Sequence, residues 1–295
     1  MKPPIVETRA MNISLTVGML MLGAKWLAYM LTGSVAIFSD AAESVVHIIA
    51  VVFASYSLRV MYRPPDDQHH YGHEKIGFFS AGLEGGLIIL AAGVIVVTAI
   101  DKLIHGVTLE RIGTGAAITG AAGAVNACLG WYLVRTGRRE NSLVIRANGK
   151  HILTDAWTSA GAVIGLLMAH FTGWLILDPI LALLFGLNII REGSSLMKAS
   201  VNGLMDRTNE QLELVAKAEL DAFCSEHDAS YHRFRLRETG ARVHIDFHMT
   251  FNDELPIASA HNLATLAEER LRARIPLPTE IFTHLEPTTL PHDHI

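Results

Sequence analysis

The sequence predicts an α-helical membrane protein with six transmembrane helices, followed by a small cytoplasmic domain whose elements run α-β-β-α-β. Three observations predict this fold class. Half of the 295 residues are hydrophobic and only 18% are charged, whereas roughly a quarter of a soluble globular protein is charged. Six apolar segments reach the length of about 20 residues that a membrane-spanning helix needs. Beyond residue 200 the composition turns polar, and shorter helix and strand patterns replace the apolar runs.

The six apolar segments are the expected transmembrane helices. They cover residues 11–31, 35–60, 78–100, 112–134, 143–171 and 174–190. The uncharged turns at 32–34 and 172–173 predict antiparallel hairpins between the helices that flank them. The fourth segment is rich in Gly and Ala, and small residues allow close helix approach, so this helix is expected inside the bundle. No small-residue cleavage signature precedes the first segment, which is therefore expected to be a retained span.

Lys and Arg residues are distributed unequally between the two sides of the membrane. One side has only Lys102 and Arg111. The other side has thirteen: Lys2, Arg9, Arg59, Arg63, Lys75, Arg135, Arg138, Arg139, Arg146, Lys150, Arg191, Lys198 and Arg207. Because cytoplasmic loops are enriched in Lys and Arg, both termini are expected in the cytoplasm.

The polar C-terminal part predicts two helices and three strands. The helices are expected at 210–226 and 256–274, and the strands at 231–239, 242–251 and 280–286. In the second strand, alternate apolar residues from Val243 to Phe251 predict a core face, and His244 and His248 point the other way. The expected domains are an N-terminal segment 1–10, a membrane domain 11–200, a hinge linker 201–207, a cytoplasmic metal-binding domain 208–288 and a His-containing tail 289–295.

Ionisable side chains lie inside two of the spans. Glu43 and His47 are four residues apart in the second span, and His151 and Asp155 are four apart in the fifth. Side chains four apart share one face of a helix, and ionisable groups inside a membrane usually mark an ion path or a ligand. Two such pairs can close a four-ligand site, although each group taken singly can be a satisfied polar group. Asp40 lies on the same stripe as Glu43 and can replace one of the four.

The residue types narrow the chemistry of this site. Two imidazoles and two carboxylates suit tetrahedral Zn²⁺ and tolerate Co²⁺, Cd²⁺ or Fe²⁺. Cys128 and Cys224 are isolated, so they form neither a disulfide framework nor a thiolate zinc finger. Within the spans, Lys25 is expected to snorkel or to pair with a carboxylate. Glu84 and Asp178 are either helix-packing partners or ion-path residues.

Two further groups of metal-ligand residues lie outside the spans. Asp66, His69 and His73 follow the second span at i, i+3 and i+7, and the alternative is a hydrophilic loop that happens to be rich in His. In the cytoplasmic domain, five residues on different elements suggest a folded metal site: His232, His248, His261, His284 and Glu286. The alternative there is surface His on a solvated sheet. The tail residues His292, Asp293 and His294 are expected to bind metal at most weakly.

Taken together, these features resemble the cation diffusion facilitator family, and in particular its bacterial zinc and iron efflux members. The resemblance covers residues 11–287 and rests on six spans with cytoplasmic ends, ligand pairs on the second and fifth, a loop of form DDxHxxGHxK and the α-β-β-α-β tail. It implies a homodimer with ferredoxin-like, metallochaperone-like cytoplasmic domains that bind metal at or near the dimer interface. It also implies metal-for-proton antiport by alternating access.

The resemblance also implies roles for particular residues. The transport site is Glu43, His47, His151 and Asp155, the loop site is Asp66, His69 and His73, and the cytoplasmic site is His232, His248, His261, His284 and Glu286. Lys75 and Asp206 fall where the family has a salt bridge at the hinge. The family's second span usually has HxxxD or DxxxD, whereas this chain has Glu43 and His47, a departure that bears on metal selectivity. Glu286 stands where Asp is usual.

The expected function is efflux of a divalent metal cation, Zn²⁺ first, in exchange for protons across the cell inner membrane. The expected partners are a second copy of the chain, the lipid bilayer, divalent metal ions and protons, with no nucleic acid. Zn²⁺ or a similar ion is expected both as substrate and as a bound regulatory ion. One alternative is a membrane-bound sensor or scaffold that binds metal without transporting it. An intramembrane metalloenzyme is a distant alternative, because the chain lacks HExxH and is not expected to be an enzyme.

Overall fold

The computed structural model describes residues 5–61, 63–139, 143–240 and 242–289, and it contains the predicted order of elements. The helices and strands are α1 Ile5–Thr32, α2 Val35–Met61, α3 Ile76–His105, α4 Ile112–Arg139, α5 Leu143–Thr172, α6 Leu177–Leu204, α7 Glu210–His227, β1 Ser230–Glu238, β2 Val243–Phe251, α8 Ile257–Arg274 and β3 Thr279–Pro287. Helices α1 to α6 are each long and apolar enough to cross a membrane. Residues 1–4 and the predicted weak metal ligands of the tail, His292, Asp293 and His294, lie outside the described residues.

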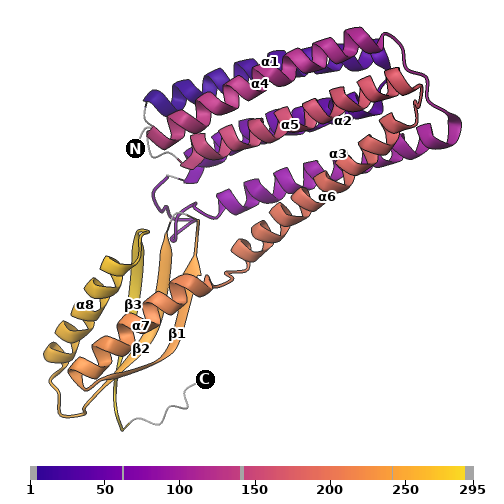
Figure 1. Ribbon diagram of the computed structural model, residues 1–295. Helices are drawn as coiled ribbons and strands as arrows, with labels where there is room; N and C mark the ends of the chain where they lie inside the picture. Colours follow the sequence, from indigo (N-terminus) through magenta and orange to yellow (C-terminus); the bar gives the residue numbers. More distant parts are fainter. Residues whose placement is uncertain (1–4, 62, 140–142, 241, 290–295) are drawn as a thin grey trace. The chain divides into compact units, whose positions relative to one another are not determined.

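Helices α1, α2, α4 and α5 pack together within the membrane part (Figure 1). Helices α4 and α5 approach closely, and a Cβ at Gly130 would lie 2.9 Å from the carbonyl oxygen of Gly149. A Cβ at Gly149 would in turn lie 2.7 Å from the backbone nitrogen of Val134. Neither position has room for a larger residue, so the small residues of the fourth span bring its backbone against α5.

Helix α3 lies beside α6 (Figure 1), and the two share a buried core with the start of α2. That core contains Val35, Ala92, Ile95, Ala99, Ala182 and Ile189. Helix α6 continues to Leu204, beyond the apolar span expected at 174–190 and into the linker expected at 201–207. The apolar run ends at Arg191, but a helix needs only its own backbone hydrogen bonds to continue, so hydropathy alone placed its end too early.

Asp178, at the start of α6, has a packing role that the sequence left open. Its side chain is fully buried and accepts hydrogen bonds from the backbone N–H of Val35 at 2.7 Å and of Ala36 at 3.3 Å. The hydroxyl of Ser34 also donates to it. The first N–H groups of a helix have no partner within the helix, so Asp178 satisfies the first turn of α2 from another helix.

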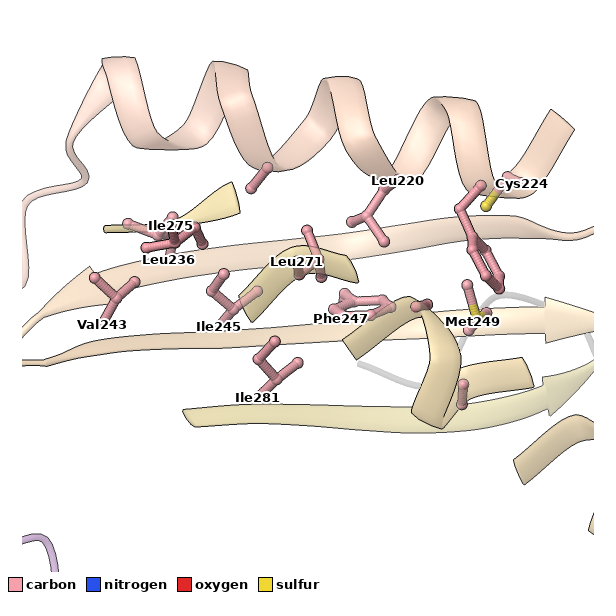
Figure 2. Close-up of a cluster of buried hydrophobic side chains, with 14 of the residues drawn as sticks. Leu220, Cys224, Leu236, Val243, Ile245, Phe247, Met249, Leu271, Ile275 and Ile281 are labelled. Atoms are coloured by element: carbon pink, nitrogen blue, oxygen red, sulfur yellow. The ribbon is translucent and has the colours of Figure 1, made fainter. Parts of the chain in front are cut away.

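The cytoplasmic part is a three-stranded sheet with α7 and α8 packed on one face (Figure 1). The strand order is β1-β2-β3, with β1 antiparallel and β3 parallel to β2. The predicted alternation of β2 is confirmed, because Val243, Ile245, Phe247, Met249 and Phe251 are all buried in the core. Figure 2 shows several of these side chains beneath Leu220 of α7 and beside Leu271 of α8. The opposite face of the sheet is left for polar side chains.

The segment 63–79 between α2 and α3 belongs to the same compact unit as residues 200–295. The domain limits expected from the sequence place this segment within the membrane domain, 11–200. Tyr71 in this segment lies against the sheet, with its ring 5.4 Å from the Arg237 guanidinium. The loop that carries one predicted metal group therefore packs on the cytoplasmic sheet.

Candidate metal sites

The two predicted ligand pairs of the membrane part face each other across α2 and α5. The rings of His47 and His151 lie 4.3 Å apart between centroids. His151 Nε2 lies 3.7 Å from Asp155 Oδ1, one helical turn along α5. That separation is too long for a hydrogen bond. We call Glu43, His47, His151 and Asp155 the membrane group.

Three atoms of this group are buried and unsatisfied. Among the described residues, no hydrogen-bond partner exists for His47 Nδ1, His151 Nε2 or Asp155 Oδ1. An unsatisfied buried polar atom costs about 1–3 kcal/mol, so three in one place indicate that something else binds them. Imidazole nitrogen and carboxylate oxygen are the donors that bind Zn²⁺ and similar ions, and the geometry therefore fits a bound dication.

The remaining member, Glu43, lies one turn before His47 on α2. The charges that act on it include Asp155, Asp40 and Lys25. A small cavity adjoins the group and is lined by His47 and Asp155 among other side chains. From α3, Glu84 also interacts electrostatically with His151, so Glu84 remains a candidate ion-path residue.

Asp40 is excluded from the membrane group by its own partners. Its Oδ1 accepts a hydrogen bond from Lys25 Nζ at 2.8 Å, and its Oδ2 accepts one from Ser159 Oγ at 2.7 Å. Lys25 itself is fully buried. Of the two roles considered for Lys25, pairing with a carboxylate is therefore the one observed, and Asp40 does not replace Glu43 as a ligand.

The loop group of Asp66, His69 and His73 assembles around one carboxylate. His69 Nδ1 lies 3.1 Å from Asp66 Oδ1, and His73 Nε2 lies 3.3 Å from Asp66 Oδ2. One ligand atom from each residue lies within 4.8 Å of the others. Desolvation would raise the pKa of Asp66, but N–H groups of Gln68 and His69 hold that pKa below its ordinary value. The carboxylate therefore stays ionised and available for a cation.

The cytoplasmic group forms on the sheet face opposite the helices. His232, His248 and His284 lie side by side in the register of β1, β2 and β3. Glu286 contacts all three imidazoles, at 2.7 Å from His248, 3.2 Å from His232 and 3.6 Å from His284. Ligand atoms of His232, His248 and Glu286 lie within 4.8 Å of one another. Desolvation would raise the pKa of Glu286, but the His248 contact and the neighbouring imidazoles hold it below its ordinary value.

A β-bulge brings His232 into this group. The register of β1 on β2 shifts by one residue between His232 and Arg235, and Arg233 has φ of 52°. Without the shift, His232 would pair with Met249, whose side chain points into the core. A one-residue shift moves a side chain to the other face of a sheet, so the bulge places His232 opposite His248.

His261 is the predicted cytoplasmic ligand that the structure does not bring to the group. It is exposed on α8, and α8 packs on the core face of the sheet, whereas the group lies on the other face. The group within one chain therefore consists of His232, His248, His284 and Glu286.

The structure joins the expected hinge residues and reveals a second contact beside them. Lys75 Nζ lies 2.9 Å from Asp206 Oδ1. The neighbouring Glu74 carboxylate is buried and accepts hydrogen bonds from the Thr239 hydroxyl and from Arg242 Nε at 2.7 Å. We call this contact the Glu74 clasp. No sequence pattern predicts this contact, because its residues are far apart in the chain and match no motif.

Six membrane-spanning helices and three groups of metal-ligand residues define a multi-pass membrane protein that handles metal cations. The chain belongs to the cation efflux family. Residues 11–205 match the cation efflux transmembrane domain, and residues 217–288 match the cytoplasmic domain of cation efflux proteins. The predicted resemblance to cation diffusion facilitators is thereby confirmed. Members of this family are transporters, so the chain is a divalent metal cation transporter and not an enzyme.

Relatives cover nearly the whole chain. An uncharacterized transporter of Synechocystis is 34% identical over 275 residues, which are 93% of this chain and 88% of the relative. The cation-efflux pump FieF of Escherichia fergusonii is 27% identical over 287 residues, 96% of this chain and 93% of the relative. The magnetosome protein MamB of Paramagnetospirillum magneticum is 27% identical over 259 residues, 88% of this chain and 86% of the relative.

Proposed function

We propose that the chain exports a divalent transition metal, Zn²⁺ first, in exchange for protons, and that the membrane group is its transport site. The observation that carries the proposal is the set of three buried, unsatisfied ligand atoms on α2 and α5 of a cation efflux protein. Two imidazoles and two carboxylates supply four donors and two negative charges. A bound dication is then neutralised, which lowers the cost of holding it inside a membrane.

Proton exchange follows from the same donors. Imidazole and carboxylate groups bind either a proton or a metal ion, so metal affinity falls as the solution becomes acidic. A site exposed to an acidic outside therefore releases its ion, and the same site exposed to the cytoplasm binds one. The excess of Lys and Arg on the side of both termini supports an orientation with those termini in the cytoplasm. The bacterial relatives support the inner membrane as the location.

Fe²⁺, Co²⁺ and Cd²⁺ are proposed as further substrates, because they accept the same nitrogen and oxygen donors. In this chain the carboxylate precedes the imidazole on α2, as Glu43 and His47, whereas the family's usual HxxxD pattern has the opposite order. We therefore expect the preference among these metal ions to differ from that of other family members.

The loop and cytoplasmic groups are proposed as regulatory sites for the same ions. The chain is proposed to act as a homodimer in which metal on the cytoplasmic groups favours a tighter dimer and biases the membrane part. The domain limits expected from the sequence remain a proposal, and segment 63–79 belongs to the same compact unit as residues 200–295.

The test is ion flux through the purified full chain in proteoliposomes. Vesicles with an acidic lumen and a trapped fluorescent metal indicator receive external Zn²⁺, Fe²⁺, Co²⁺, Cd²⁺, Mn²⁺ or Ni²⁺. We expect Zn²⁺ uptake that is faster than in empty vesicles and that slows when an ionophore collapses the pH gradient. Tight binding without uptake would identify a sensor or scaffold instead. A Zn²⁺ uptake rate that stays the same after the pH gradient is collapsed would rule out metal-for-proton antiport.

The cytoplasmic group makes a separate prediction. Glu286→Gln is expected to lower its Zn²⁺ affinity by at least about tenfold, because removing a partner at a metal site typically costs 10- to 100-fold. Chelator competition measures this affinity in full-length protein that also carries Asp66→Asn and Asp155→Asn. These two substitutions weaken the loop group and the membrane group, so that the measured affinity is that of the cytoplasmic group. Glu269→Gln, which changes an exposed residue of α8, is the matched control. Equal affinities for the two variants would remove Glu286 from the site.

A further inference from the structure

A buried network of three helices surrounds one carboxylate beside the membrane group. Lys25 of α1 is fully buried and donates to Asp40 Oδ1 at 2.8 Å and to Ser44 Oγ at 3.0 Å. Ser159 of α5 donates to Asp40 Oδ2 at 2.7 Å. Both oxygens of Asp40 are therefore engaged, one by a charged donor. These four side chains lie outside the set of proposed transport ligands.

The position of Asp40 makes it a fifth potential ligand. Residues 40, 43 and 47 follow one another at i, i+3 and i+7, so Asp40 shares the helix face of Glu43 and His47. Its charge acts on both Glu43 and Asp155. The difference between Asp40 and the ligands lies in their partners, because Asp155 Oδ1 has none among the described residues.

We propose that Lys25 and Ser159 determine metal selectivity by holding Asp40 out of the coordination shell. The inference rests on the proposed transport site. With Asp40 held, the site offers two nitrogen and two oxygen donors, a set suited to four-coordinate Zn²⁺. With Asp40 released, the site gains a third carboxylate and a higher coordination number, which suit Mn²⁺ and other ions that favour oxygen donors.

Charge supports the same conclusion. Lys25 and Asp40 form a neutral pair, so the network adds no net charge next to the site while the pair is intact. Removing the ammonium leaves the buried Asp40 carboxylate with the Ser159 hydrogen bond but without a counter-ion, a costly state that a bound cation relieves. A Lys25 that merely anchored α1 to α2 would affect all metals alike, and the ratio of affinities for two metals distinguishes the two roles.

The experiment measures Mn²⁺ and Zn²⁺ affinity and flux for full-length protein in proteoliposomes. In Lys25→Met, the Mn²⁺ to Zn²⁺ affinity ratio is expected to rise at least about tenfold, the lower end of the affinity change that mutation of an outer-shell group at a metal site typically causes. Zn²⁺ is expected to bind more tightly and to be carried more slowly, because a fifth ligand retards its release. The double variant Lys25→Met/Asp40→Asn, which also removes the released carboxylate, is expected to restore the parent ratio.

Two further variants make the outcome decisive. Ser159→Ala frees one oxygen of Asp40 while the ion pair with Lys25 remains, and it is expected to shift the ratio toward Mn²⁺ even if Lys25→Met does not fold. Lys198→Met, which changes an exposed residue of α6, is expected to leave the ratio unchanged. An unchanged ratio in Ser159→Ala, or a double variant that keeps the Lys25→Met ratio, overturns the proposal. A parent protein that carries no Zn²⁺ would overturn the transport function itself.

Discussion

Asp155→Asn is expected to lower gradient-driven Zn²⁺ flux by at least about 100-fold, the upper end of the loss seen when a metal-site partner is removed. The substitution keeps the shape of the side chain but removes its charge. Asp155 is 4% exposed, and its Oδ1 has no hydrogen-bond partner among the described residues. The amide therefore leaves the dication with a weaker, neutral oxygen donor and with one uncompensated charge in a buried site. Proteoliposome flux, with protein insertion matched between samples, measures the effect.

The chain offers a matched control for this variant on α3. Asp101 and His105 are also four residues apart, with 2.9 Å between carboxylate and ring nitrogen, but both are exposed. Asp101→Asn makes the same chemical change in the same helical spacing, and flux is expected to stay at the parent level. If Asp155→Asn carried Zn²⁺ as fast as Asp101→Asn, the transport site would lie elsewhere.

Phe247→Ala is expected to destabilise the cytoplasmic domain by about 3–5 kcal/mol, the usual cost of emptying a buried Phe site. Phe247 is 1% exposed on β2 and packs in the core beneath Leu220 of α7 and beside Leu271 of α8 (Figure 2). The next residue is His248, so loss of this strand also disperses the cytoplasmic metal group. Hydrogen exchange of β2 amides in the full chain is expected to accelerate about a hundredfold or more.

Phe282→Ala is the control for this prediction, because it removes the same side chain from the neighbouring strand β3. Phe282 is 61% exposed, and substitutions at exposed positions usually change stability by less than about 0.5 kcal/mol. Equal acceleration of β2 exchange in both variants would contradict the assignment of Phe247 to the core.

Much of this fold could be predicted from local sequence patterns. Hydropathy located the six helices, and the alternation from Val243 to Phe251 identified the core face of β2, because burial on one face imposes a period of two. The spacing of Glu43 with His47 and of His151 with Asp155 depends only on helix geometry. The structure brings the two rings together across α2 and α5.

Features that depend on contacts across the chain could not be predicted in this way. The bulge at Arg233 has no sequence signal, since Arg is not a residue that favours positive φ, yet it decides on which face His232 lies. The sequence leaves Lys25 either to snorkel or to pair with a carboxylate, and it is the packing of α1 against α2 that pairs Lys25 with Asp40. His261 was grouped with the other ligands by residue type, and the placement of α8 on the core face separates it from them.

The Glu74 clasp has a thermodynamic consequence for the loop group. Glu74 directly follows His73, so the segment that receives a metal ion is fastened to Thr239 and Arg242 of the sheet. Free-energy coupling between two events is reciprocal. If an ion at Asp66, His69 and His73 strengthens the fastening by some factor, the fastening strengthens the hold on that ion by the same factor. A higher metal concentration would then stabilise the contact of Glu74 with the sheet, and a more stable contact would raise the metal affinity of the loop group.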